Sequence, residues 1–177
     1  MAYLICSPIM DKEPIIFILI CWMVFCLYKF IQEILKDIKE SKLILKSTYP
    51  KLIKGVLYYC APIYKNHQIK YYPLHQISYY PSKKRLGYYD PSLKKLVIHI
   101  NSHDGSESAK LKQIVHTTLH EIKHHIQHQT NPDFKNYEFY SKKLSYQKNP
   151  FEIDSNAFAD KHTDHCIKYL KERGILE

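Results

Sequence analysis

The pentapeptide His120-Glu121-Ile122-Lys123-His124 has the residue types and the spacing of a metal site that activates water. Residues four apart in an α-helix lie one turn apart on the same face, so the imidazoles of His120 and His124 can bind one metal ion. Glu121 can then reach a water on that ion and serve as the general base. A catalytic zinc site needs three protein ligands and one open position. The motif therefore predicts such a site and requires a third ligand from elsewhere in the chain.

Further histidines lie around the motif. His116 and His128 extend the four-residue spacing on both sides, and His125 lies near the apolar stripe of the same helix. Only His120 and His124 bracket a glutamate that is placed to act as the base, so we assign these two as ligands. We interpret His116 and His128 as exposed residues or as neighbours of the ligands, and His125 as a residue of the core or a neighbour of the ligands.

The third ligand has one leading candidate. Position 130 is Thr130, so the arrangement with a third histidine six residues after the second is absent from the sequence. Glu152 lies on a predicted helix that carries the small residues Ser155 and Ala159 on the same side, which would allow a close approach to the HExxH helix. Two alternatives stay open: Glu152 could instead cap the start of its own helix, and Asp154 could be the ligand.

Apolar periodicity and turn signals predict the elements that position these residues. Leu111, Ile114, Val115, Leu119, Ile122 and Ile126 form the buried stripe of a helix over 108–128. Asn149 and Pro150 mark the start of a final helix that ends before Gly174. A short helix is expected over 52–59, and strands over 77–80, 86–89 and 96–100. Asp90-Pro91-Ser92 predicts a turn that joins the last two strands in a hairpin. We take 96–100 as the candidate edge strand, along which a substrate could lie.

An unbroken apolar run over 15–28, extended to 31 past Lys29, is interpreted as a transmembrane anchor. The alternatives are a removed secretory signal and a buried apolar helix. Lysines are much more frequent after the run than before it, which places the C-terminal domain in the cytoplasm. Apolar residues at helical spacing predict that an amphipathic juxtamembrane helix follows over 32–48.

Composition limits the remaining classes. A chain of 177 residues suits one domain of ordinary size, and its net charge of +9 would favour anionic partners. The lysines are scattered and form no nucleic-acid motif, so a nucleic-acid partner is not expected. The five cysteines include no CxxC pair, a pattern typical of a reducing compartment, with a single Cys60–Cys166 bridge left open.

The order of strand, polar loop, HExxH helix and glutamate-bearing helix resembles the ImmA/IrrE-type zinc peptidases and, more distantly, the SprT-like peptidases. The matching segments are 118–124 and 152–159, within a resemblance that covers about residues 85–165. The resemblance implies that Zn²⁺ is bound by His120, His124 and Glu152 and that Glu121 is catalytic. Two positions depart from that family: Lys123 replaces a frequent glycine and Ser155 the usual alanine. The N-terminal hydrophobic segment is also unusual, and no helix-turn-helix domain is present, so the role of repressor cleavage does not transfer.

Together these features predict an α+β zincin-like metallopeptidase domain with a small sheet and an HExxH helix, preceded by an N-terminal transmembrane helix. The expected organisation is a flank over 1–14, the anchor over 15–31, the amphipathic helix over 32–48 and the peptidase domain over 49–177. The expected partners are a protein or peptide substrate and the membrane. Tyr137, Tyr140, Tyr146 and His162 are candidates to assist the chemistry. The competing hypotheses are an inactive zincin-like binding module at a membrane and a basic nucleic-acid-binding protein.

Overall fold

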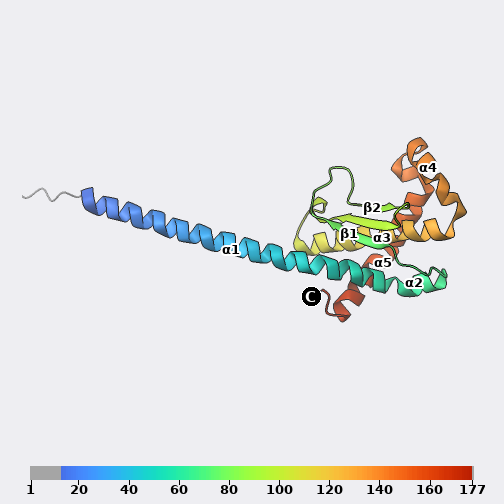
Figure 1. Cartoon of the computed structure of the whole chain (residues 1–177), viewed down its shortest axis with the longest axis horizontal. Helices are drawn as coiled ribbons and strands as arrows, with labels where there is room; N and C mark the ends of the chain where they lie inside the picture. Colours follow the sequence, from blue (N-terminus) through green and yellow to red (C-terminus); the bar gives the residue numbers. More distant parts are fainter. Residues whose placement is uncertain (1–12, 177) are drawn as a thin grey trace, which may run out of the picture. The chain divides into compact units, whose positions relative to one another are not determined.

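The computed structural model describes residues 13–176, and the chain divides into two units between Leu45 and Lys46 (Figure 1). The first helix, α1 (Glu13–Tyr59), contributes to both units. The second unit contains ten further elements. In chain order they are α2 (Ala61–Asn66), β1 (Leu74–Ser78), β2 (Gly87–Asp90), β3 (Lys95–His99), η1 (Ile100–Ser102), α3 (Glu107–Thr130), η2 (Pro132–Asn136), α4 (Tyr137–Lys143), η3 (Tyr146–Lys148) and α5 (Pro150–Glu172).

The N-terminal part of α1 corrects one prediction. Among the described residues, no helix combines the length and the apolar character needed to cross a membrane. The unbroken apolar run over 15–28 has 14 residues, which at about 1.5 Å per residue gives roughly 21 Å of helix against a hydrocarbon core of about 30 Å. The predicted transmembrane anchor over 15–31, the predicted fold class that included it, and the predicted single-pass membrane localisation with a cytoplasmic domain are therefore wrong.

The C-terminal part of α1 belongs to the core of the second unit. Leu52, Ile53 and Val56 are fully buried there. The sequence predicts two separate helices, over 32–48 and 52–59, but α1 continues through Pro50 to Tyr59. Proline removes one backbone hydrogen bond from a helix, and the burial of these apolar side chains offsets that loss. The side chains of 36–47, on which most of the predicted amphipathic face would lie, are outside the described residues, as is most of the predicted flank over 1–14.

The second unit also contains a three-stranded sheet with the order β1-β3-β2. β2 and β3 form the predicted hairpin, with Gly87 opposite Ile98 and Asp90 opposite Lys95. The Asp90 carboxylate accepts hydrogen bonds from the backbone N–H groups of Ser92 and Leu93, which fixes the turn. β1 pairs with β3 in parallel. β3 is therefore the central strand, the prediction that it forms an edge is wrong, and β2 and β1 are the two edges.

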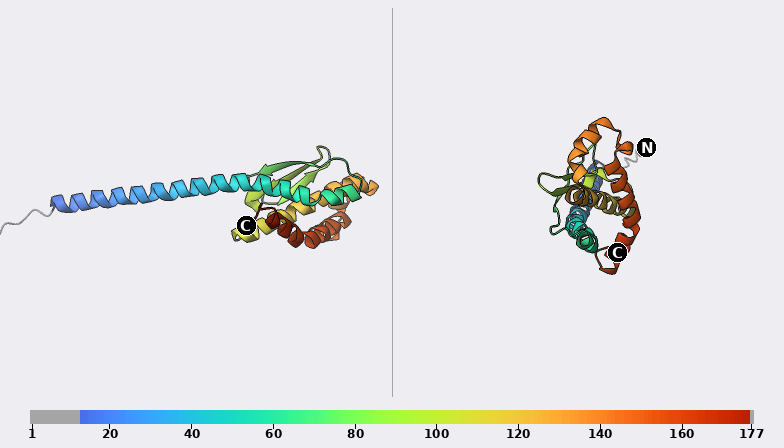
Figure 2. Two further views of the ribbon diagram at one scale, coloured as in Figure 1. Left: turned by 90° about the horizontal axis from the view of Figure 1, so that it is seen from below. Right: turned by 90° about the vertical axis from the view of Figure 1, so that its right-hand side faces the viewer.

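The helix α3 lies between the sheet and α5 (Figure 2). Its side chains Ile114, Val115, Leu119, Ile122 and Ile126 are buried as predicted, whereas Leu111 is half-buried. Leu96 and Ile98 of β3 are fully buried in the same core. Because α3 is covered on two sides, polar residues between its apolar positions are also removed from water. This packing buries His120, Glu121, Ile122 and His124 of the HExxH motif and leaves Lys123 half-buried.

The two cysteines of the second unit, Cys60 and Cys166, are buried and free, so the bridge left open by the sequence is absent from this structure. Burial raises the pKa of both thiols, that of Cys166 to about 12. Each thiol therefore stays protonated and unreactive in the folded protein.

Candidate metal centre

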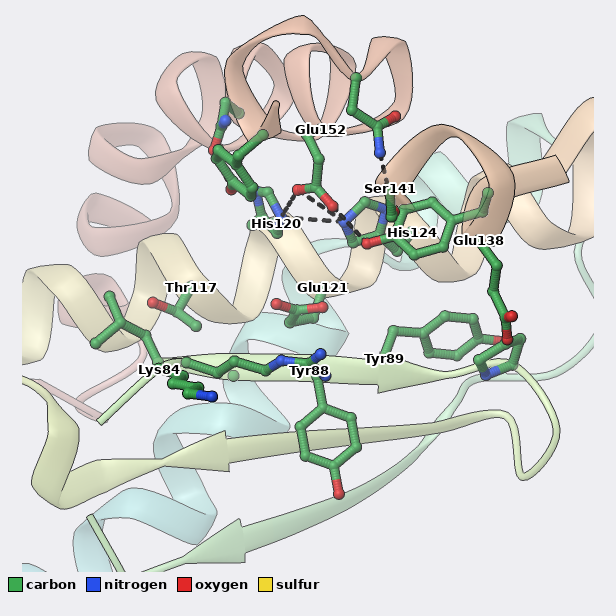
Figure 3. A pocket seen from close by; sticks show the side chains of 18 of the residues that line it. Lys84, Tyr88, Tyr89, Thr117, His120, Glu121, His124, Glu138, Ser141 and Glu152 are labelled. Carbon is green, nitrogen blue, oxygen red and sulfur yellow. Dashed lines mark hydrogen bonds and ion pairs between the residues drawn. The ribbon is translucent and has the colours of Figure 1, made fainter. Parts of the chain in front are cut away.

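His120 and His124 project from the buried middle of α3. The helix begins one residue after Ser106, whose hydroxyl accepts a hydrogen bond from the N–H of Ala109. This cap fixes the start of α3 three turns before the motif. The Nε2 atoms of the two histidines are 3.1 Å apart and both rings are buried. The helix therefore presents two imidazole nitrogens at one point, as the four-residue spacing predicts (Figure 3).

Glu152 reaches the same point from α5. Asn149 caps that helix by accepting a hydrogen bond from the N–H of Phe151, and Pro150 occupies its first turn, as predicted. Glu152 Oε2 lies 3.1 Å from His120 Nε2 and 3.4 Å from His124 Nε2. The three donor atoms form a buried group that can hold a metal ion. Glu152 therefore faces the two histidines across the helix interface, which favours the interpretation as a ligand over that as a helix cap.

The separations of the donor atoms fit one small ion. Tetrahedral zinc with bonds of about 2.0–2.1 Å places its ligand atoms about 3.3 Å apart. The three observed separations are 3.1, 3.1 and 3.4 Å. Glu152 Oε2 is in addition the one buried side-chain oxygen or nitrogen of the described residues that has no hydrogen-bond partner. A cation between the three atoms would satisfy that oxygen, so the residues present fit a bound metal.

The neighbours of Glu152 keep it ionised. Burial acts to raise the pKa of its carboxyl, but the close His120 and His124 rings outweigh that effect and hold the pKa well below its ordinary value. The hydroxyl of Tyr137 donates a further hydrogen bond to Oε1. Tyr137 thereby orients the carboxylate through Oε1, and Oε2 is left to face the two histidines.

Glu121 lies on the other side of the motif, between α3 and β2 (Figure 3). The side chain is buried, and burial raises the pKa of its carboxyl to about 7. The charge of His120 opposes this rise, the charge of Glu152 adds to it, and a hydrogen bond from the backbone N–H of Tyr89 lowers the pKa again. A carboxyl with a pKa near neutrality can both accept and return a proton, which is the property that a general base of this kind needs.

Gly87 lets the edge strand approach the motif helix. A Cβ atom at this position would lie 2.8 Å from Cγ2 of Thr117 on α3 and 3.0 Å from the carbonyl oxygen of Val97. The first separation is shorter than Cβ contacts in real proteins, and the second, to a backbone atom of the central strand, is tighter than most of them. A residue without a side chain is therefore favoured where β2 lies this close to α3 and to the turn that carries Glu121.

A pocket of about 830 Å³ joins these groups. His120, Glu121, His124 and Glu152 line it together with β2 residues and with Tyr137 and Tyr146. Tyr140 and His162, which the sequence left as candidates, are not among its lining residues. Tyr140 packs against Phe151, and His162 Nδ1 is 3.0 Å from the Tyr59 hydroxyl.

The other histidines have partners outside the metal group. His116 pairs with Asp160 at 2.9 Å, and His128 Nδ1 is 2.8 Å from the Tyr89 hydroxyl. His125 is buried, with its Nδ1 atom 3.0 Å from the Tyr64 hydroxyl. These contacts agree with the interpretation of His116 and His128 as exposed residues or neighbours of the ligands, and of His125 as a core residue or neighbour. Of the histidines of α3, His120 and His124 thus belong to the candidate centre.

Gln127, which the sequence analysis did not single out, connects the two ligand helices. Its Oε1 atom is 2.9 Å from His124 Nδ1, and its Nε2 atom donates to the carbonyl oxygen of Phe151 at 3.1 Å and to Asp154 at 2.9 Å. An amide oxygen can only accept, so His124 carries its proton on Nδ1 and presents an unprotonated Nε2 to the metal group. The position of Gln127, three residues after His124 on the same helix face, could have identified it as a neighbour of the ligand.

The two departures from the family pattern contribute to this arrangement. Lys123 pairs with Asp154 at 3.1 Å, so the reserve ligand Asp154 points away from the metal group and towards Lys123 and Gln127. The hydroxyl of Ser155 is 3.2 Å from His124 Nδ1. Lys123 therefore ties α3 to α5 beside the site, and Ser155 adds a polar contact behind the second histidine.

Replacing Gln127 by leucine is expected to lower the affinity for zinc by about 10- to 100-fold, because the partner that orients a metal-binding histidine is lost. Leucine has a similar volume, so the helix interface stays filled. Competition with a zinc-binding dye on the full chain measures the effect. Gln129→Leu, at an exposed position of the same helix, is the matched control and should bind zinc like the wild type. Equal affinities in the two variants would contradict the orienting role.

Comparisons with known proteins identify no relative. No family model matches the chain, and neither the curated proteins nor the solved structures contain a significant match. The resemblance to the ImmA/IrrE-type peptidases therefore rests on the two sequence motifs, and the function is argued from the geometry of the site.

Proposed function

We propose that the second unit is a zinc-dependent peptide hydrolase, with zinc held by His120, His124 and Glu152. The observation that carries this proposal is the triangle of donor atoms, with separations of 3.1, 3.1 and 3.4 Å. All three donors are buried, and they come from two helices that are capped and packed against each other. A glutamate beside the first histidine is not needed for a structural site, and it favours catalysis over metal storage.

Bound zinc would supply a Lewis acid that lowers the pKa of water towards about 7 and polarises a peptide carbonyl. Glu121 would accept the proton of the attacking water and deliver it to the leaving amine. Its burial and its pKa of about 7 suit both transfers. Gln127 would keep the His124 ring in its orientation, and Tyr137 would do the same for the Glu152 carboxylate.

The edge strand β2 provides a place for an extended peptide. Leu86 and His99 form a hydrogen-bonded pair, because the N–H of His99 donates to the carbonyl of Leu86. Hydrogen-bonded and non-bonded pairs alternate along antiparallel strands, so the backbone groups of Gly87 and Tyr89 point away from β3. The N–H of Tyr89 donates to Glu121, which leaves the carbonyl of Tyr89 and the backbone groups of Gly87 for a substrate. Both residues line the pocket. A substrate strand added at this edge would run past Glu121 and the metal group.

Tyr146 is the better of the two pocket tyrosines to stabilise the charge that develops on the carbonyl oxygen. The Tyr137 hydroxyl already donates to Glu152. The centroid of the Tyr146 ring lies 6.4 Å from that of His120, and its hydroxyl makes a long hydrogen bond of 3.4 Å to Asn156 and a weaker interaction with Glu152. A weakly held hydroxyl beside the metal group can turn to donate to the oxyanion at little cost.

The purified full chain is expected to contain close to one zinc per molecule and to hydrolyse members of a peptide library derived from a proteome. Elemental analysis measures the metal, and mass spectrometry measures the cleavage products. Removal of zinc with a chelator should abolish cleavage, and re-addition should restore it. Folded protein that contains no zinc and takes up none would contradict the proposal, whereas zinc without hydrolysis of any peptide would favour a binding module.

A further inference from the structure

Three consecutive cations, Lys83, Lys84 and Arg85, precede the edge strand β2, with Leu86 between them and its first residue. Lys84 and Arg85 line the pocket of the metal centre, and Figure 3 shows Lys84 at the end of the pocket where β2 begins. The same two residues, together with Lys83, also line a neighbouring hollow. We call these three residues the basic wall. They separate the candidate catalytic pocket from the hollow beyond the start of the edge strand.

The basic wall is held in place by its backbone. The hydroxyl of Ser82 accepts hydrogen bonds from the N–H of Arg85 at 3.1 Å and from that of Lys84 at 3.4 Å. Ser82 in turn donates its N–H to the Ser102 hydroxyl at 2.6 Å, and Ser102 donates back to the Ser82 carbonyl at 3.1 Å. The loop is thus fixed to η1, which directly follows the central strand. A preordered loop loses less entropy when a ligand binds to it.

The charges of the wall are not neutralised. Among the side chains that the structure describes, no carboxylate forms an ion pair with Lys84 or Arg85, although Lys112, Lys123 and Lys142 each have an acidic partner. Asp104 lines the neighbouring hollow and forms no ion pair with the wall either.

We propose that Lys84 and Arg85 form a subsite for an acidic side chain of the substrate, close to the scissile bond. This inference rests on the proposed function. A peptide paired with Gly87 and Tyr89 would continue past the start of β2 and bring a neighbouring side chain to the wall. A carboxylate there can accept charge-assisted hydrogen bonds from the guanidinium and the ammonium groups. The substrate class is thus a peptide with glutamate or aspartate at one position near the bond that is cut.

The test starts from one cleaved peptide, in which each position from four residues before to four residues after the scissile bond is changed in turn to glutamate or to glutamine. With the wild-type full chain at low salt, glutamate is expected to raise kcat/KM roughly tenfold over glutamine at one position, as two partly exposed ion pairs would. The double variant Lys84→Gln with Arg85→Gln should lose this ratio. Lys142→Gln should keep it, because Lys142 lines the same pocket but pairs with Glu138 at 3.5 Å.

Several results would overturn the subsite while leaving the hydrolase intact. An unchanged ratio in the double variant would do so. A preference of the same size at every position would also do so, because it would reflect only general attraction to a chain of charge +9. Charge reversal provides an independent readout: Lys84→Glu with Arg85→Glu should shift the preference at that one position to lysine. A variant that remains active without such a shift would contradict the proposal.

Failure of the hydrolase proposal itself can be recognised separately. If the wild type cuts no peptide, fluorescence anisotropy on the full chain still compares the binding of labelled glutamate and glutamine peptides. A roughly tenfold difference in Kd that disappears in the double glutamine variant would support the acidic subsite without catalysis. Equal Kd values would overturn it. Binding of a single-stranded oligonucleotide that depends on Lys84 and Arg85, with no dependence for the peptides, would assign the wall to phosphates instead.

Discussion

Replacing Glu121 by glutamine is expected to lower kcat/KM for a cleaved peptide by about 10²- to 10⁴-fold while the zinc content stays close to one per chain. The amide keeps the shape of the side chain but cannot accept the proton of the attacking water. The buried site should tolerate the change, because burial, together with the neighbouring charge of Glu152, already raises the pKa of the Glu121 carboxyl and thus disfavours its ionised form. Peptide kinetics and elemental analysis on the same preparation provide the two readouts.

The matched control for this variant is Glu138→Gln. Glu138 is another carboxylate of the same pocket, but it pairs with Lys142 and has no contact with the metal group. This variant should retain most of the activity. If Glu121→Gln remained fully active, the proton acceptor would have to be another group. Loss of zinc from Glu121→Gln would instead show that the carboxylate maintains the site rather than the reaction.

Substitution of His120 or His124 by alanine is expected to weaken zinc binding by about a hundredfold or more. Apparent binding free energies at sites with four protein ligands reach about 10–16 kcal/mol, so one ligand of three carries a large share. Glu152→Ala should have an effect of the same kind. The measurement is competition with a chelator of known affinity, using the full chain, with circular dichroism to verify that each variant is folded.

Three other residues of the same helices provide the controls for the ligand assignment. His116→Ala and His128→Ala should retain most of the affinity, because the two side chains contact Asp160 and Tyr89 rather than the metal group. Asp154→Ala should reduce it only modestly, through the hydrogen bond to Gln127. If His116→Ala or His128→Ala lowered the affinity for zinc as much as His120→Ala does, the ligand assignment would be contradicted. A large loss at Asp154 with none at Glu152 would move the third ligand to Asp154.

The local elements of the candidate site were predictable from the sequence because their signals lie within a few residues of one another. The four-residue spacing of His120 and His124 placed them on one helix face, and Asn149 with Pro150 marked the start of α5. The choice of Glu152 required in addition that two helices pack closely, which the small residues Ser155 and Ala159 indicated. Both are fully buried in the structure.

Features that depend on distant pairing were not predictable in the same way. The parallel pairing of β1 with β3 places residues about twenty positions apart side by side, and nothing local in Leu96–Ile100 distinguishes a central strand from an edge. The continuation of α1 through Pro50 depends on the burial of Leu52, Ile53 and Val56, a tertiary effect that overrides the local preference. The transmembrane prediction for the apolar run over 15–28, extended to 31, is wrong, because among the described residues no helix is long and apolar enough to cross a membrane.

The proposed ligands and the rest of the pocket lie on different elements, and this affects how the sequence of such a protein can change during evolution. The proposed ligands and base are all on α3 and α5, which pack against each other, whereas β2, the loop before it and the segment with Tyr146 form the rest of the pocket. Substitutions in the basic wall change exposed side chains and leave the helix interface untouched. The proposed preference for an acidic substrate can therefore change during evolution, or be altered by design, without loss of the residues that we propose as metal ligands.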